Sequence, residues 1–352
     1  MSANQIVTPH DLILVTGANG FIGSRVVRTL LDRGFHNLRC FVRPSGNMTR
    51  LRDLLVDRKD ARIEIVHGNL LSREDCEKAA DGIAVIYHLA AGIEKTFPGS
   101  FMNSVVTTRN LLEAVLKKGC LKRIVNVSSF AVYSNMNIPR GGVLDESCEL
   151  ESRFMERFEA YAFGKAKQDE IVQEYGRKHG IPYVIVRPGA VFGPGKIGLT
   201  GRVGIDTFGF FIHLGGSNRL PLTYVDNCAE AIVLAGIVEG VEGEVFNVVD
   251  DGMPTSREFL KMYKKRVRSF RSIFIPYSLF YGLCVLWEKY SRWSEGQLPP
   301  AFNRRRCAAE WKGNRYPNEK LKRLLGWKPK VSYDEGVRRF SDFARTQKEN
   351  TT

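Results

Sequence analysis

The chain has 352 residues and a formal net charge of +14, with 43% hydrophobic and 26% charged residues. That length can bury one large α/β core and a smaller lobe, and the polar residues 1–11 carry no cationic-then-apolar secretion signal, so we expect a cytoplasmic protein. Seven dispersed cysteines without a C-x-x-C pair and six histidines without ligand spacing argue against a disulfide framework and against a metal site.

The N-terminal residues predict a strand, a glycine-rich turn and a helix. Residues 12–16 form a short apolar run typical of a buried parallel strand, and residues 24–34 have the apolar spacing of an amphipathic helix. Between them Gly17 permits a tight turn, Gly20 lets the backbone approach a pyrophosphate, and Gly23 allows the helix to pack closely on the strand. We therefore expect a dinucleotide at the helix N-terminus, although the spacing G-x-x-G-x-x-G differs by one residue from the common fingerprint.

The next predicted strand, residues 38–42, ends at Arg43. A site selective for NAD places an acidic residue here, where it binds the ribose 2′-hydroxyl. A cation at this position favours the 2′-phosphate of NADP instead. We therefore expect NADP in preference to NAD, with the alternative that Arg43 is a solvated strand-end residue.

Further apolar segments alternate with helical segments along the chain, at residues 63–67, 85–89, 124–128, 183–187 and 245–248. This alternation predicts an α/β fold with a doubly wound parallel sheet, a Rossmann domain, whose ligand lies beyond the carboxyl ends of the strands. A smaller substrate lobe would be formed by insertions. We divide the chain into residues 1–195, mainly the Rossmann domain; 196–222, a lobe insertion; 223–251, a return to the Rossmann core; 252–345, mainly the C-terminal lobe; and 346–352, a tail.

Tyr161 and Lys165 are spaced i and i+4, which places both side chains on one face of a helix. A nearby ammonium favours the ionised phenol, and a tyrosine whose pKa falls below its usual value of ~10 can exchange a proton with a hydroxyl group near neutral pH. Alone, this spacing is more often a half-buried aromatic beside a solvated amine. In the context of the glycine turn, it predicts a redox enzyme.

Together these features resemble the extended short-chain dehydrogenases/reductases, the superfamily of nucleotide-sugar epimerases and dehydratases, hydroxysteroid dehydrogenases and related ketone reductases. The resemblance runs in family order over residues 11–345. Besides the glycine turn and the Tyr161/Lys165 pair, it rests on Tyr87-His88-Leu89-Ala90-Ala91, Val127-Ser128-Ser129-Phe130-Ala131-Val132-Tyr133, Arg187-Pro188-Gly189-Ala190-Val191-Phe192-Gly193-Pro194, Tyr224-Val225-Asp226-Asn227-Cys228-Ala229-Glu230-Ala231 and Gly326-Trp327-Lys328-Pro329.

The resemblance implies a role for each matching residue. Tyr161 would be the acid/base, Lys165 would lower its pKa and bind the nicotinamide ribose, and Ser129 would donate a hydrogen bond to the substrate oxygen. Ser129 is preferred to Ser128 because it lies four residues before Tyr133; the alternative for either serine is strand-end capping. The cofactor would be bound by Gly17, Gly20, Phe21, Ile22, Gly23, Arg43, Asn69, Leu70, Leu89, Ala90, Ala91, Tyr161, Lys165, Pro188 and Val191.

Two positions depart from the family pattern. Asn69, expected beside the adenine after the third strand, stands where the family usually has aspartate. Ser104 occupies the position of the asparagine that leads the helix at residues 105–116, which puts a proton relay through that helix in question.

The positive charge is unevenly distributed. Residues 257–352 contain 23 Lys and Arg against 9 Asp and Glu, whereas the preceding residues are balanced. This basic part could neutralise an anionic substrate such as a nucleotide diphosphate, hold the enzyme on an anionic lipid surface, or be a solvated face without a partner. No recognition module for nucleic acid is present, so nucleic acid is not an expected partner.

Residues 273–287 are apolar on all sides, but only about 16 residues separate Arg271 from Glu288, fewer than the ~18–20 needed to span a bilayer. With the basic run at 261–268 and the pair Tyr290/Trp293, the segment suggests a helix lying in a membrane interface. The alternative is a helix that roofs the substrate pocket. Similar segments in the hydroxysteroid-dehydrogenase-like branch favour peripheral contact, on the cytoplasmic face, through residues 261–293.

We therefore expect an NAD(P)-dependent oxidoreductase that transfers hydride between nicotinamide and a secondary alcohol or ketone. The apolar segments 208–214 and 273–287 favour a bulky lipid-like or steroid-like substrate, and a sugar remains an alternative. The first alternative enzyme is a nucleotide-sugar epimerase, in which the hydride returns to the substrate and the cofactor stays bound. A dehydratase is less expected because no acidic residue lies near Ser129. A non-catalytic regulatory or scaffold protein is the alternative of another class, and the family suggests a homodimer.

Overall fold

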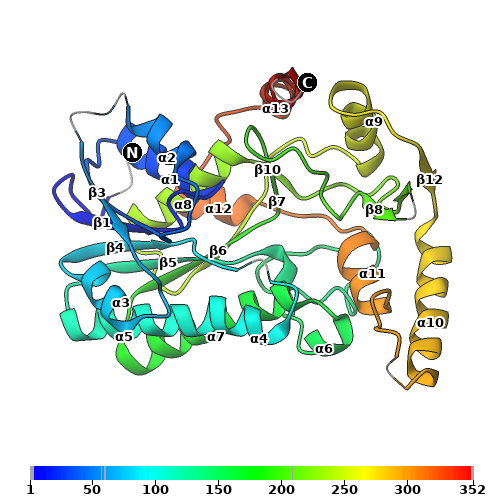
Figure 1. Ribbon diagram of the computed structural model, residues 1–352, viewed down its shortest axis with the longest axis horizontal. Helices are drawn as coiled ribbons and strands as arrows, with labels where there is room; N and C mark the ends of the chain where they lie inside the picture. Colours follow the sequence, from blue (N-terminus) through cyan, green and yellow to red (C-terminus); the bar gives the residue numbers. More distant parts are fainter. Residues whose placement is uncertain are drawn as a thin grey trace.

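The main body of the computed structural model is a seven-stranded sheet with helices on both faces (Figure 1). The structure describes residues 4–56, 58, 61–92, 94–207, 209–295 and 297–349. The strand order is β11-β6-β5-β4-β1-β2-β3, and every neighbouring pair is parallel. The predicted doubly wound parallel sheet is confirmed.

The strands of this sheet form where the sequence has short apolar runs. Burial is nearly complete in the central strands because helices cover both faces, which is typical of parallel sheets. Each predicted segment agrees with a strand to within two residues at either end. The strands are β1 Leu12–Thr16, β2 Asn37–Val42, β3 Arg62–His67, β4 Ile83–His88, β5 Arg123–Val127, β6 Tyr183–Pro188 and β11 Val245–Val248.

Two groups of helices cover the two faces of the sheet. One face is covered by α1 (Gly23–Asp32), α2 (Thr49–Leu55) and α8 (Val225–Ile237), whose apolar residues share a single buried cluster. The other face is covered by α3 (Arg73–Ala80), α5 (Thr107–Lys118) and α7 (Ala160–His179). The helix α7 is the element that carries Tyr161 and Lys165.

The helical segment that includes α5 begins earlier than residue 105, the predicted start. It consists of α4 (Phe97–Ser100), a π-helical segment η1 (Phe101–Val106) and then α5. The helix starts here because the Thr96 hydroxyl accepts a hydrogen bond from the Gly99 N–H and Pro98 occupies the first turn. The sequence prediction missed this start because the π-helix has more residues per turn than an α-helix. The apolar residues before and after it therefore do not follow one continuous α-helical period.

Residues from both predicted insertions meet in the smaller lobe, together with α6 (Phe154–Arg157) and β7 (Ala190–Phe192) from the first 195 residues. β8 (Gly204–Thr207) and β9 (Phe210–His213) come from the first insertion and pair with β12 (Ser272–Phe274) from the second. Phe208, part of the apolar segment in the prediction, lies outside the described residues. The lobe also contains a two-stranded sheet of β7 and β10 (Leu222–Tyr224), and the helices α6, α9 (Ser256–Arg266), α10 (Tyr277–Trp293) and α11 (Arg304–Trp311).

The chain returns to the main body at its C-terminal end. α12 (Glu319–Leu325) and the fully buried Trp327 join the cluster formed by α1 and α8, and the Trp327 indole donates a hydrogen bond to the Asn227 carbonyl at 3.0 Å. α13 (Tyr333–Glu349) packs on the adjoining cluster around Phe192 and Tyr224. Residues 319–327 therefore add to the Rossmann core, although they lie in the range predicted to be mainly lobe; the domain boundaries themselves stay a prediction.

Candidate active site

The carboxyl ends of β1, β4, β5 and β6 lie at one edge of the sheet because these strands are parallel. β1 lies between β2 and β4. The chain adds β2 and β3 on one side of β1 and then β4 and the later strands on the other side, so the strand order reverses at this point. Open α/β sheets bind ligands in the crevice at such a reversal. Every residue predicted for the site follows one of the strand ends at this edge or lies on α7.

The glycine turn after β1 has a backbone shape that fits a dinucleotide. Gly17 has φ +69°, a conformation that favours glycine. A β-carbon at Gly23 would lie 2.1 Å from the Gly17 carbonyl oxygen, so α1 can start this close to the turn only with glycine there. No side chain caps the start of α1, at Ile22, although the N–H groups of Ser24 and Arg25 already donate to the carbonyls of Gly20 and Ile22, so an anion would meet the N–H groups that precede them.

The segment after β4 packs against this turn. The Leu89 N–H donates to the Thr16 carbonyl at 3.3 Å and the Ala90 N–H to the Thr16 hydroxyl at 3.2 Å. A β-carbon on Gly17 would lie 3.1 Å from the Ala90 nitrogen. Leu89, Ala90 and Ala91 are all partly exposed, so the structure places them beside the glycine turn with surface left for a ligand.

Arg43, Asn69 and Leu70 lie at the far end of this edge, beyond β2 and β3. Arg43 is exposed, and no hydrogen bond or ion pair of its guanidinium is found within the described chain. The Asn69 side chain accepts a hydrogen bond from the Leu71 N–H at 3.0 Å. Asn110 of α5 holds the same loop by donating to the Leu70 carbonyl at 2.9 Å, a positioning role that the sequence did not reveal.

Pro188 and Val191 lie where the main sheet passes into the lobe. Pro188 is the last residue of β6, and Val191 lies on β7, where it pairs with Thr223 of β10. Val191 contacts the apolar clusters of both the main body and the lobe. These two residues therefore lie between the two parts of the protein, close to the β5 and β6 ends.

The structure brings the three predicted catalytic residues together. Ser129 follows β5 and caps the short 3-10 helix η2 (Phe130–Val132), while Tyr161 and Lys165 lie in the first two turns of α7. The Ser129 hydroxyl, which accepts a hydrogen bond from the Ala131 N–H at 3.2 Å, lies near enough to the Tyr161 phenol to favour its ionised form. Tyr161 is partly buried, and Lys165 is only 3% exposed.

The pKa of Tyr161 is shifted in the direction opposite to the sequence expectation. Burial raises the pKa of the phenol, the Ser129 hydroxyl opposes this shift, and the carboxylates of Glu159 and Asp169 add to it. Lys165 has no part in this shift of the Tyr161 pKa. The expectation that Lys165 lowers this pKa is therefore wrong in this structure, because the cost of desolvating a phenolate outweighs the favourable interactions.

The ammonium of Lys165 is directed toward the strand ends. Its Nζ donates to the Val127 carbonyl at 2.5 Å and to the Gln168 Oε1 at 2.9 Å. Burial lowers the pKa of Lys165 to about 8, while the carboxylate of Asp169 acts in the opposite direction. The lysine is thus charged at neutral pH but close to losing its proton.

Asp169 explains why Ser128 and Ser129 differ in role. Its carboxylate accepts hydrogen bonds from the Ser128 hydroxyl at 2.9 Å and from the Asn126 amide at 2.8 Å. It also forms an ion pair with Arg187 at 3.1 Å, in which the side chains are 1% and 3% exposed. Ser128 is therefore occupied by a structural contact, and Ser129 is the serine that faces Tyr161.

A chain of buried polar side chains connects Lys165 to the end of β1. Gln168 accepts from Lys165 and donates from its Nε2 to the Thr108 hydroxyl at 2.8 Å. The same hydroxyl lies 2.9 Å from His88 Nε2, and His88 Nδ1 lies 2.8 Å from the Thr16 hydroxyl. Sequence analysis missed this chain because its members come from four separate elements.

The hydrogen-bond directions in this chain are determined by its two ends. The Thr108 hydroxyl donates to the Ser104 carbonyl at 2.5 Å, so it accepts from both Gln168 and His88. His88 Nε2 therefore carries the ring proton, so Nδ1 accepts from the Thr16 hydroxyl, which itself accepts from the Ala90 N–H. Burial lowers the pKa of His88 to about 3, so the ring is neutral with its proton on Nε2.

Charged side chains from the lobe reach toward Tyr161. Glu159, two residues before it, pairs with Arg157 at 2.7 Å. Burial raises the pKa of Glu159, Arg157 opposes this shift, and Glu310 of α11 adds to it. The buried Arg202 donates a hydrogen bond to the Ala309 carbonyl of α11 at 3.0 Å. No local sequence signal could have found this group, because its members meet only through the packing of the lobe.

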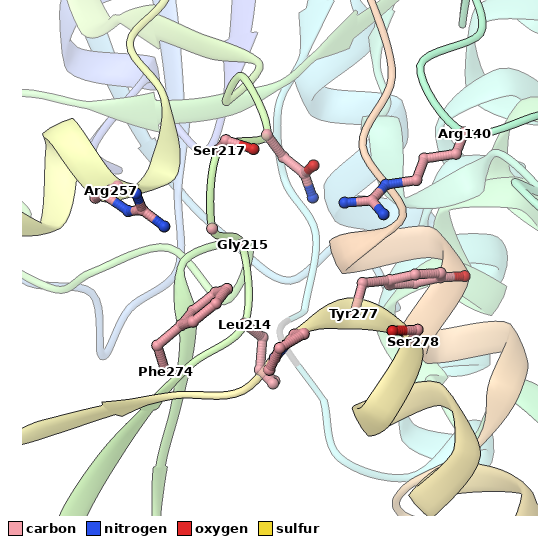
Figure 2. Close-up of a pocket in the computed structure, with 11 residues that line it drawn as sticks. Arg140, Leu214, Gly215, Ser217, Arg257, Phe274, Tyr277 and Ser278 are labelled. Carbon is pink, nitrogen blue, oxygen red and sulfur yellow. The ribbon is translucent and has the colours of Figure 1, made fainter.

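A separate pocket of about 100 Å³ lies within the lobe, between β9, α9 and the start of α10. Figure 2 shows Arg140 and Arg257 on opposite walls, each with its guanidinium directed toward the space between them. Arg140 lies 5.6 Å from the ring of Tyr277, and Arg257 lies 5.6 Å from the ring of Phe274. Such aromatic contacts hold both guanidinium groups in place and leave their N–H donors to face the pocket.

Comparison with known proteins identifies the family of the chain. The model of the NAD dependent epimerase/dehydratase family matches residues 13–248. Cinnamoyl-CoA reductase 1 of Oryza sativa subsp. japonica is 31% identical over 186 residues, which are 52% of this chain and 54% of that protein. Sterol demethylase protein B of Methylococcus capsulatus is 27% identical over 333 residues, covering 90% of this chain and 93% of that protein. The chain thus spans about half the length of some curated relatives that it matches, the reductase among them.

Solved structures show the same fold. A UDP-glucuronic acid 4-epimerase from Bacillus cereus, solved in complex with UDP-glucuronic acid and NAD, superposes with a TM-score of 0.70 at 22% identity, covering 96% of this chain and 99% of that chain. At this identity the likeness shows the fold alone. The family match, in contrast, extends over more than half of the sequence. The chain therefore belongs to the NAD-dependent epimerase/dehydratase family of the extended short-chain dehydrogenases/reductases.

Proposed function

We propose that this protein is an NAD(P)-dependent oxidoreductase that transfers hydride between nicotinamide and a secondary alcohol or ketone. The observation that carries this proposal is the grouping of Ser129, Tyr161 and Lys165 at the sheet edge where the glycine turn fits a dinucleotide. The cofactor would be held by the turn at residues 17–23, by residues 89–91 and by Lys165, Pro188 and Val191. When bound, it supplies or accepts the hydride at nicotinamide C4.

Tyr161 acts as the acid/base in this proposal. Since burial holds the pKa of its phenol above the usual value, Tyr161 carries its proton at neutral pH. During ketone reduction it gives this proton to the carbonyl oxygen, while Ser129 donates a hydrogen bond to the same oxygen as negative charge develops there. Oxidation of an alcohol would first require loss of the phenol proton, so the geometry favours reduction near neutral pH.

A bulky lipid-like or steroid-like substrate is supported by the lobe and by one relative. The lobe exposes Phe210, Ile273 and Phe274, whose exposed fractions are 44%, 54% and 45%. One of the relatives that match over nearly the whole chain is a protein named for sterol demethylation. A sugar substrate stays in the proposal because the charged group around Glu159 and Arg202 can form hydrogen bonds with hydroxyl groups.

A nucleotide-sugar epimerase is the second candidate, and the pocket in Figure 2 favours it. Two guanidinium groups that face each other across a small space suit the charge of a diphosphate. The B. cereus epimerase, which shares the fold, was solved with UDP-glucuronic acid and NAD. In such an enzyme the hydride taken from the substrate is returned to it, and the cofactor is not exchanged.

For the cofactor, we propose NADP in preference to NAD. Support comes from Arg43, an exposed cation at the end of β2 for which no partner is found in the described part of the chain. Its distance from the catalytic residues suits the adenosine end of a dinucleotide, since β2 is three strands from β5, about 14 Å at ~4.8 Å per strand.

For partners and location, we propose a homodimer and peripheral contact with an anionic membrane surface through residues 261–293, on the cytoplasmic face. All seven cysteines are free thiols, which suits a reducing compartment. Among the described residues, no helix has both the length and the apolar character required to cross a membrane. Contact with a membrane through residues 261–293 would therefore be peripheral.

Replacement of Tyr161 tests the proposed chemistry. Tyr161→Phe should lower turnover of an alcohol or ketone substrate about 10²- to 10⁴-fold, because the proton donor is lost. The Kd for NADPH, measured by fluorescence titration, should stay nearly unchanged because only a hydroxyl group is removed. Tyr175→Phe, further along the same helix, is the matched control and should keep full turnover. A Tyr161→Phe enzyme with most of its activity would contradict the assignment.

The pKa of Lys165 predicts the pH dependence of reduction. The ammonium is present below about pH 8 and is lost above it, so kcat/KM should be level at lower pH and fall as the pH rises through about 8. Gln168→Leu removes an acceptor of the ammonium and should move the falling limb about one unit toward lower pH. Gln173→Leu on the same helix should leave the profile unchanged. A limb that stays in place in Gln168→Leu would show that Gln168 does not support the charged lysine.

Reversal of the charge at Arg43 tests the cofactor preference. Arg43→Asp should lower the ratio of kcat/KM for NADPH to that for NADH by at least about tenfold, since a charge-assisted contact with the 2′-phosphate is replaced by repulsion. Arg62→Asp, at the opposite end of the neighbouring strand β3, is the control. An unchanged ratio in Arg43→Asp would refute the role in phosphate binding.

The two candidate functions differ in what the purified protein retains. Freshly purified protein should be denatured and the released NAD(H) and NADP(H) quantified by mass spectrometry. We expect little cofactor, with NADPH binding on addition, because a reductase exchanges its cofactor in every cycle. Near-stoichiometric NAD would favour the recycling epimerase and would also contradict the proposed role of Arg43.

A further inference from the structure

The outer face of α10 carries a continuous apolar stripe. Its members, which we call the outer stripe, are Leu279, Leu283, Leu286, Tyr290 and Trp293, between 45% and 77% exposed. Their spacing of four, three, four and three residues keeps them within an arc of about 80° on a helix of 3.6 residues per turn. Apolar residues at this spacing normally face a core, so an exposed set indicates a surface that is covered by something else.

The opposite face of the same helix is already occupied. Phe280 and Cys284 are 6% and 1% exposed and share a buried cluster with Cys307 and Trp311 of α11. They also line a cavity of about 200 Å³ together with Phe302. The helix therefore covers the interior of the lobe with one face and presents the outer stripe with the other. The two predicted roles of this segment, roofing and surface contact, belong to different faces.

The segment that leads into α10 is strongly basic. From residue 259 to residue 287 the chain contains six Lys and Arg and no Asp or Glu. Lys261, Lys265, Arg266, Arg268 and Arg271 are all exposed. In Figure 1, α9, β12 and α10 follow one another along one margin of the molecule, with α11 on the inner side of α10. Basic and apolar surfaces therefore adjoin on the same outer margin.

We infer that the outer stripe docks on an anionic lipid surface, with α10 lying in the plane of the interface and the cations of residues 261–271 facing lipid phosphates. This inference rests on the proposed peripheral contact and deepens it by naming the face, the orientation and the charge of the lipid. An interfacial helix combines an apolar face with adjoining cations in this way. Tyr290 and Trp293, whose rings stack at 5.6 Å, end the stripe with side chains that favour the boundary between hydrocarbon and water.

A second copy of the chain fits this surface less well. In a two-fold dimer each surface meets itself, so stripe-to-stripe contact with antiparallel helices would leave both basic segments without an anionic partner, and contact with parallel helices would bring them close together. With no carboxylate between residues 259 and 287, that arrangement would lack local compensation of the repulsion. Anionic lipid supplies both the apolar layer and the opposite charge.

Vesicle flotation with the full chain tests the inference. The wild type should float with vesicles of phosphatidylcholine and about 30% phosphatidylserine, should not float with phosphatidylcholine alone, and should be released at about 1 M NaCl, where the Debye length is about 3 Å. Leu279→Ser/Leu286→Ser should lower the bound fraction at least about tenfold. Lys265→Gln/Arg268→Gln should also lower it, by about tenfold.

Matched controls separate docking from a general loss of apolar or basic surface. Val56→Ser/Met155→Ser removes two residues that are each 67% exposed, compared with 58% and 63% for Leu279 and Leu286. Arg52→Gln/Arg62→Gln removes two exposed cations of the main body. Both control variants should float like the wild type. Thermal unfolding of every variant should match the wild type, because all the altered side chains are exposed.

The outcomes distinguish this inference from the proposals on which it rests. If the wild type floats and Leu279→Ser/Leu286→Ser floats equally well, the peripheral contact stands and the outer stripe is the wrong surface. If the wild type floats with neither kind of vesicle, the peripheral contact and the role of the outer stripe are both refuted. A dimer in sedimentation analysis that dissociates in Leu279→Ser/Leu286→Ser without any flotation would overturn the inference and assign the stripe to self-association. Turnover in solution is independent of all three results, so a failure of the redox chemistry would be seen separately.

Discussion

The buried carboxylate of Asp169 is the constraint on which the geometry of the active site depends. It lies on α7 and binds Arg187 of β6 and Ser128 at the end of β5, so it ties the helix that carries Tyr161 and Lys165 to two strand ends. Removing one partner of such a buried pair typically costs about 3–5 kcal/mol, because the other charge is left without compensation. From Arg187 the network continues through Tyr133 to Asn247 of β11, so it spans the sheet from β5 to its edge strand.

The sequence predicted the features that depend on neighbouring residues. The glycine turn, the strand positions and the pairing of Tyr161 with Lys165 on one helix all follow from short-range spacing, and the structure has them. The direction of the Tyr161 pKa shift was mispredicted, because desolvation depends on the packing of the whole site and is not encoded in the spacing of two residues. The contacts of Glu159 and Arg202 were missed for the same reason, since they join α7 to α11 and to residues of the first insertion.

The lobe shows how two insertions far apart in the sequence become one unit. Their strands pair side by side in one small sheet, and α10 closes over α11 on top of it. The composition of the sequence correctly located the excess of positive charge in the C-terminal part. It could not tell which residues of α10 would be buried and which would be exposed. An apolar run on all sides is ambiguous until the packing of its neighbours is known, because the buried face and the exposed face use the same residue types.

The polar chain between Lys165 and Thr16 has a consequence for proton movement. Gln168 on one side and His88 on the other both donate a hydrogen bond to the Thr108 hydroxyl, whose own proton is held by a backbone carbonyl. At the other end of the chain, the Thr16 hydroxyl accepts a hydrogen bond from a backbone N–H. Hydrogen bonds that converge on one acceptor do not relay a proton in this arrangement, and burial keeps His88 neutral near neutral pH. This chain is therefore a rigid support and not a proton relay. We expect the proton that Tyr161 exchanges to reach bulk water through the substrate side of the site.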